Sequence, residues 1–164
     1  MGAGGKVSAV LAVVVVIFGI IGGYAFYAST IYPLDQGVAW ISRAQTAGHA
    51  TEMIENIQNA QQLLQNKHGN PAWWFPTSLT DWDRINNDLS SQKARLQEIN
   101  SLRESNPDAY QQGLDDVRGK LRVTYEQMES TISWEWISPI IIFLYAVVII
   151  LAVVLFAIAL LYWD

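Results

Sequence analysis

Residues 7–29 read VSAVLAVVVVIFGIIGGYAFYAS, and this stretch decides the fold class. No charged residue occurs anywhere in 7–32, and none occurs in 137–163. Each run is longer than the ~20 apolar residues that an α-helix needs to cross the ~30 Å hydrocarbon core of a bilayer. A helix buried in a soluble protein seldom stays apolar on every face over this length. The sequence therefore predicts an all-α membrane protein with two transmembrane helices, over 7–32 and 137–163.

The orientation of the two spans follows from the basic residues near them. The first apolar core exceeds the usual ~7–15 residues of a signal peptide and has no good A-x-A cleavage site, so a retained anchor behind a short tail at 1–6 is expected. Lys6 favours a cytoplasmic N-terminus by the positive-inside rule. Arg43 and Arg118, near the span ends on the opposite side of the membrane, weaken this argument. We expect an integral protein of the cell or cytoplasmic membrane with both termini cytoplasmic and the segment 33–136 extracytoplasmic.

The segment 33–136 carries fourteen of the fifteen acidic residues and nine of the ten basic residues, and the formal net charge of the chain is -5. An acidic surplus repels phosphates, so nucleic acid is not an expected partner. The chain has no cysteine, which excludes disulfides, thiolate metal sites and a cysteine nucleophile.

Apolar residues at three- and four-residue steps predict three helices in this segment, over about 36–67, 80–105 and 107–136. The last two have similar lengths and form an expected antiparallel hairpin, with Thr80 as the N-cap of the first arm. Because the 107–136 helix leads into the membrane, the 80–105 helix begins near it. The 36–67 helix must then either lie along the membrane surface or break near Gly48. Otherwise the loop that follows it must run back to the membrane in extended form.

The hairpin is preceded by GNPAWWFPTSLTDWD at residues 69–83, which places four large aromatic residues in a proline-bracketed loop. Tryptophan prefers the membrane interface because its ring is amphipathic. An interfacial or partner-docking role is therefore expected for one set of aromatic residues: Trp40, Trp73, Trp74, Phe75, Trp82, Trp134 and Trp136. Trp163 is expected at the far end of the second span. The alternative is that these rings close the base of the helical domain.

Gly19 and Gly23 form a G-x-x-x-G pattern in the first span, which allows another helix to approach closely. The partner is either another subunit or the second span, whose small residues are Ala146, Ala152 and Ala157. Neither span contains an ionisable residue, which argues against a channel or transporter acting alone.

The sequence gives little support for metal binding or catalysis. His49 and Glu52 share a helix face and are weak metal candidates, but the pattern has no second copy on the other helices. No nucleophile elbow, phosphate-binding loop or zinc motif is present. We therefore expect no catalytic residue and no cofactor.

Three functions remain open. The first is a non-catalytic accessory or structural subunit of a larger membrane complex. Its partners would be lipid and other integral membrane subunits, which can include further copies of itself. The second is a membrane-anchored sensor or adaptor with a helical ligand- or protein-binding ectodomain. The order of span, helical domain and span is similar in plan to the sensor half of bacterial chemoreceptors, but no motif is shared. The third is a virion or cell-surface assembly protein.

Overall fold

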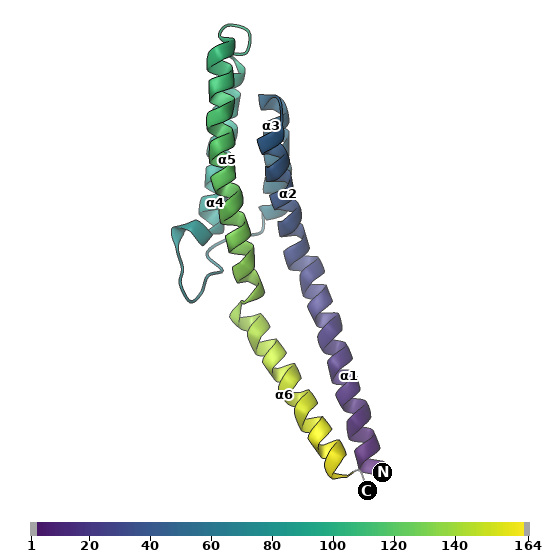
Figure 1. The fold of residues 1–164 in the computed structure, drawn as a ribbon. Helices are drawn as coiled ribbons and strands as arrows, with labels where there is room; N and C mark the ends of the chain where they lie inside the picture. The colour runs from purple at the N-terminus through teal and green to yellow at the C-terminus, as the bar shows by residue number, and fades with distance from the viewer. Residues whose placement is uncertain (1–2, 163–164) are drawn as a thin grey trace. The chain divides into compact units, whose positions relative to one another are not determined.

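The computed structural model describes residues 3–162 and is 84% helical, with no strand in that range. The expected all-helical class is confirmed. The elements in order are α1 (Ala3–Phe26), η1 (Tyr27–Ile31), α2 (Tyr32–Thr46), α3 (Ala50–Leu64), η2 (Ser78–Thr80), α4 (Trp82–Asn100), α5 (Pro107–Trp136) and α6 (Pro139–Leu161) (Figure 1). They form two compact units, one containing α1 and α6 and the other made of residues 30–136.

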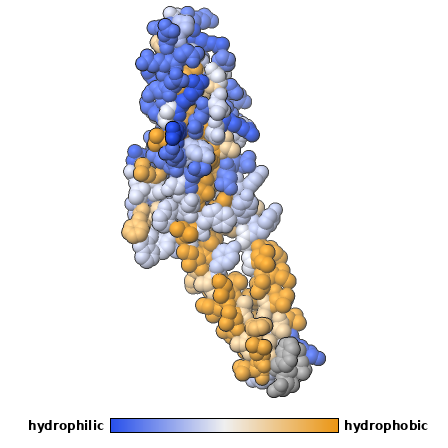
Figure 2. All heavy atoms as spheres, in the orientation of Figure 1, coloured by the Kyte–Doolittle hydropathy of each residue, from blue (hydrophilic) through white to orange (hydrophobic). Residues whose placement is uncertain are grey.

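Helices α1 and α6 are long and apolar enough to cross a membrane. A core helix of a soluble protein would be mostly buried, whereas 6% of the most apolar window in the first helical run is buried, and 0% in the second. Figure 2 shows hydrophobic side chains over the visible face of both helices. Their exposed side chains are thus suited to an apolar environment.

The two apolar helices run antiparallel. Gly5 lies against the backbone of Tyr162, and Gly19 lies against Val148. The less exposed positions of α6 are spaced by seven residues or by three and four, apart from the adjacent pair at the end: Ile141, Val148, Ala152, Leu155, Ile158 and Ala159. A repeat of about 3.5 residues is the pattern of two helices that cross with a left-handed twist.

The other unit is a bundle of four helices, each packed mainly against two neighbours, in the order α2, α3, α4, α5 and back to α2. Helix α4 is antiparallel to α5, because Gln92 bonds to Thr124 while Ile99, further along α4, meets Gly113. In Figure 1, α4 lies behind α5.

Helix α3 runs parallel to α5. The amide of its first residue, Ala50, donates a hydrogen bond to the Tyr110 hydroxyl near the start of α5, and Lys67, just past its end, pairs with Glu135 at the end of α5. The bundle therefore alternates in direction from helix to helix. One end of it, which we name the proximal end, contains the start of α2 and the end of α5, where the chain continues into α1 and α6.

The bundle core is built from the predicted apolar stripes, and its buried side chains come from all four helices. The largest fully buried ones are Trp82, Ile31, Leu34, Ile41, Met53, Ile57, Leu64, Ile85, Leu89, Leu96, Ile99 and Leu114. Burying one such side chain stabilises the fold by about 1.5–3 kcal/mol.

The segment expected as one helix over 36–67 is two helices, α2 and α3, that meet at a corner of extended backbone over 47–49. Three bonds hold this corner. The Arg118 guanidinium donates to the Ala47 carbonyl at 2.8 Å, the Ala50 amide donates to the Tyr110 hydroxyl at 3.0 Å, and the Gly48 amide donates to the Glu52 carboxylate at 3.3 Å. The break near Gly48 allows α3 to return to the proximal end.

Helix α2 follows α1 without a gap, although Pro33 lies in its first turn. Proline has no N–H to donate and its ring clashes with the carbonyl four residues earlier. The preceding turn, η1, is a π-helix, whose wider spacing accommodates such a residue. The chain thus remains helical across the position where a helix end was expected.

Two glycines of α5 provide a matched test of the bundle packing. A Cβ at Gly113 would lie 2.8 Å from Ile99 Cγ2, whereas a Cβ at Gly119 meets nothing within 4 Å. Because an isoleucine in a helix has little rotamer freedom, we expect Gly113→Ala to lower the free energy of unfolding by about 1 kcal/mol. Gly119→Ala is expected to raise it by up to ~1 kcal/mol through helix propensity. Chemical denaturation of the full chain in mild detergent measures both, and equal effects of the two variants would contradict this packing.

Candidate interaction surfaces

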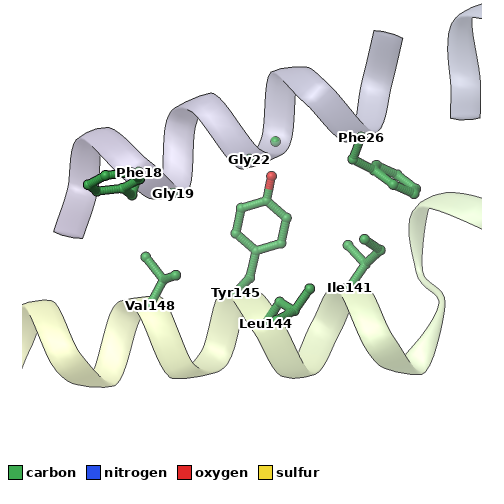
Figure 3. Close-up of a pocket in the computed structure, with 9 residues that line it drawn as sticks. Phe18, Gly19, Gly22, Phe26, Ile141, Leu144, Tyr145 and Val148 are labelled. Carbon is green, nitrogen blue, oxygen red and sulfur yellow. The ribbon is translucent and has the colours of Figure 1, made fainter. Parts of the chain in front are cut away.

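Gly19 and Gly23, the predicted helix-packing residues, both face α6 of the same chain. A Cβ at Gly19 would lie 2.9 Å from Val148 Cγ1, and one at Gly23 would overlap the Tyr145 hydroxyl. Figure 3 shows Tyr145 pointing from α6 across to α1 beside Gly22. Of the small residues expected on the second helix, Ala152 lies in the packed strip, whereas Ala146 and Ala157 are exposed.

A hollow of about 370 Å³ lies between these helices beside Tyr145 (Figure 3). Its lining is almost wholly apolar: Phe18, Gly19, Gly22, Gly23, Phe26, Ile141, Leu144, Tyr145 and Val148. Gly22 is open to it, because a Cβ there would meet nothing within 4 Å. The contact between α1 and α6 is therefore narrow, and the side chains that line the hollow beside it are accessible to lipid chains or to another helix.

The aromatic loop, residues 65–81, joins α3 to α4 and lies at the proximal end of the bundle. At its tip Trp73, Trp74 and Phe75 are 43%, 62% and 66% exposed. The ring centroids of Trp73 and Trp74 are 5.1 Å apart in an edge-to-face arrangement, and Phe75 is 6.3 Å from Trp74. Adjacent aromatic rings therefore form one exposed cluster.

The loop is held together by Asn70, which sequence reasoning did not single out. Its side-chain oxygen accepts hydrogen bonds from the Ala72 amide and from the hydroxyl of the buried Thr80, both at 2.9 Å. Its amide group donates to the Thr77 carbonyl at 2.5 Å. Asparagine before proline is a turn signal, and Asn70 with Pro71 was the visible sign of this structure.

The base of the loop is closed by the first turn of α4. Asp81, and not the expected Thr80, is the N-cap, because its carboxylate accepts from the amides of Asp83 and Arg84. The Asp83 carboxylate accepts from the Gly69 amide at 2.9 Å and meets His68 Nδ1 at 3.0 Å. The hydrogen bond with His68, followed by that from Gly69, lowers the pKa of Asp83 below its usual value.

Trp82 does not belong to the exposed cluster, which corrects the docking role expected for it. Its ring is 1% exposed, and its Nε1–H donates to Glu135 Oε1 at 3.0 Å. The same oxygen accepts from Lys67 Nζ at 3.1 Å. Trp82 closes the base of the bundle instead, as the alternative reading of the sequence had it, and Glu135 gave no signal in the sequence.

The remaining tryptophans lie on different parts of the bundle. Trp40 is half-buried in α2, with the Arg43 guanidinium 4.4 Å from its ring centroid. Trp134 is half-buried and Trp136 is 43% exposed, both at the end of α5. Trp163 lies outside the described residues.

Helix α3 presents a polar surface without charge. Residues 56–66 contain no ionisable side chain, and Gln58, Gln61, Gln62 and Gln65 line a groove of about 400 Å³ with Lys93 of α4. Gln61 bridges the two helices, because its amide donates to Ser90 Oγ at 2.9 Å and its oxygen accepts from Lys93 Nζ at 3.1 Å. We name this region the glutamine surface.

The metal candidates do not gather further ligands. His49 and Glu52 are both exposed, and the Glu52 carboxylate accepts the Gly48 amide at the start of α3. Between residues 3 and 162 no group of three histidine or acidic side chains is placed to hold an ion.

No protein-family model, curated protein or solved structure matches the chain. Function therefore rests on the surfaces described above.

Proposed function

We propose that the protein is a non-catalytic accessory subunit of a larger integral membrane complex. In this proposal α1 and α6 cross the membrane, the termini are cytoplasmic, and the four-helix bundle lies on the extracytoplasmic side, where it docks on partner subunits. The charge-free runs 7–32 and 137–163 support membrane insertion of these helices and argue against an ion or proton path of their own.

The glutamine surface is the observation that carries the proposal. The bundle is otherwise rich in charged side chains, yet Gln58, Gln62 and Gln65 are exposed in a stretch of eleven residues, 56–66, that has none. The centres of protein interfaces are depleted in charge because each buried charge must be desolvated. Apart from Lys93, the side chains that line the groove are uncharged donors and acceptors, and such a face is suited to a protein partner.

Purification of the tagged full chain from native membranes in mild detergent tests the proposal. We expect one or more integral membrane proteins to co-purify in fixed stoichiometry. Introducing charge with Gln58→Lys and Gln62→Lys is expected to weaken this association by at least about tenfold, since burying unpaired charges costs well over ~1.4 kcal/mol.

The matched control replaces two exposed glutamines of α5, Gln111 and Gln112, by lysine. This variant adds the same charge outside the glutamine surface and should keep the partners. A chain that purifies alone and responds to a small ligand would favour the sensor, and self-association into a lattice would favour the assembly protein. Either result contradicts the accessory role.

A further inference from the structure

We propose that the aromatic loop inserts its tip, formed by Trp73, Trp74 and Phe75, into the headgroup region of the bilayer that α1 and α6 cross. The loop would then be a lipid-binding foot of the bundle. This inference rests on the proposed function only in requiring that α1 and α6 are transmembrane.

The position of the loop within the bundle is the first argument. Lys67 and Trp82, which flank the loop, both bond to Glu135, one residue before the last residue of α5. Only Ile137 and Ser138 separate α5 from α6. The loop therefore leaves the bundle at the end from which the chain enters the apolar helices. Two residues span at most about 7 Å, so this end lies close to the membrane if those helices cross it.

The chemistry of the loop is the second argument. Residues 69–80 contain no charged side chain, and exposed apolar groups occur at Trp73, Trp74, Phe75 and Leu79. Such a cluster is costly in water, because each large aromatic side chain exposes area that burial would remove from solvent. Tryptophan at the interface buries its ring among acyl chains while its N–H reaches headgroups or water.

The rigidity of the loop is the third argument. Asn70 bonds both to Ala72 and to Thr80, while Pro71 and Pro76 bracket the aromatic residues and restrict the backbone. The cluster is thus formed before it meets lipid, so that little conformational entropy is lost on insertion.

The charges near the loop indicate which lipids it binds. Lys67 is paired with Glu135 and His68 with Asp83, and no other basic residue lies in 65–81. Insertion should therefore depend on apolar contact and not on attraction to anionic headgroups. We expect it in pure phosphatidylcholine and at high salt.

Site-directed spin labelling of the full chain in phosphatidylcholine nanodiscs tests the foot, since the chain has no cysteine to remove. A nitroxide at Trp74→Cys should be more accessible to oxygen, which concentrates in lipid, than to a water-soluble nickel complex. A label at Ser105→Cys, exposed in the turn between α4 and α5 at the other end of the bundle, should show the reverse preference.

A second variant tests whether the aromatic residues cause the insertion. A label at Leu79→Cys should report lipid in the native loop and water when Trp73, Trp74 and Phe75 are all replaced by serine. An unchanged signal in the serine variant would overturn the proposal.

A third label separates this inference from the proposed function. Val14→Cys lies on the exposed side of α1 and reports lipid if that helix crosses the membrane. If Val14 reports lipid while Trp74 shows the nickel accessibility of Ser105, the foot is excluded and the transmembrane role stands. Low access of both reagents to Trp74 would mean a protein contact and would likewise exclude the foot.

Discussion

Replacing both Gly19 and Gly23 by leucine is expected to separate α1 from α6. The Gly19 Cβ would already be 2.9 Å from Val148, and the Gly23 Cβ would overlap the Tyr145 hydroxyl, so neither site has room for a leucine. Overpacking costs typically ~1–3 kcal/mol per site, and the double variant should therefore lose roughly 2–6 kcal/mol of helix-pair stability.

Two measurements check this expectation in the full chain in mild detergent. The first is a disulfide between cysteines placed at Ala12 and Leu155, which lie on the facing strips of the antiparallel pair. It should form readily in the parent chain and poorly in the double variant. The second is the unfolding midpoint, which should fall.

The control is Gly22→Leu, which adds the same side chain one position from Gly23, where a Cβ meets nothing within 4 Å. It should leave both the disulfide and the midpoint nearly unchanged. If the control and the double variant behave alike, the glycines act through a general effect on α1 and not through contact with α6.

The parts of the fold that were predictable from the sequence depend on local pattern. The charge-free runs identify α1 and α6 because the length and polarity of a helix are properties of consecutive residues. The buried positions of α4, such as Ile85, Leu89 and Leu96, follow from the three- and four-residue spacing. Gly19 and Gly23 were likewise recognisable as a close-packing pair, although the sequence did not choose between α6 and another subunit.

The corner between α2 and α3 was not predictable in the same way. A break near Gly48 was one of the arrangements that the sequence left open. The corner is held by Tyr110 and Arg118, which lie 60 and 71 residues from their partners Ala50 and Ala47. Nothing in the local sequence shows that a hydroxyl and a guanidinium from α5 will satisfy these backbone groups.

The role of Trp82 was not predictable either, because it depends on a residue far away in the sequence. An indole ring suits either a membrane interface or a bundle base, and the outcome depends on whether its N–H finds a buried acceptor. Glu135, 53 residues later, provides that acceptor. The rings of Trp73 and Trp74, by contrast, remain exposed.

Glu135→Ala is the second substitution for which we expect a large effect. It removes the acceptor of the Trp82 N–H, on a side chain that is 1% exposed, and the counter-charge of Lys67, whose side chain is 23% exposed. An unsatisfied buried donor costs about 1–3 kcal/mol, and a partly buried lysine without its partner adds to this. We expect the free energy of unfolding of the bundle to fall by roughly 2–4 kcal/mol.

Matched variants assign this loss to its causes. Glu135→Gln keeps an oxygen for one donor and removes the charge, so it should cost less than alanine. Glu126→Ala removes a carboxylate that pairs with Arg122 on the exposed side of α5, and such surface pairs contribute only about 0–1 kcal/mol. In a Lys67→Met background Glu135→Ala should cost less than in the parent chain, because the lysine charge is no longer left unpaired.

The Glu135 contacts also determine how firmly the aromatic loop is held, because Lys67 and Trp82 stand at its two ends. When both contacts are lost, the 65–81 segment should open without the rest of the bundle unfolding, since α4 and α5 still pack along their length. Hydrogen exchange of the full chain should therefore show faster exchange of the Gly69 and Trp82 amides in Glu135→Ala, with the amides of central α5 little changed. Equal acceleration throughout the bundle would mean that Glu135 supports the fold as a whole and not the loop in particular.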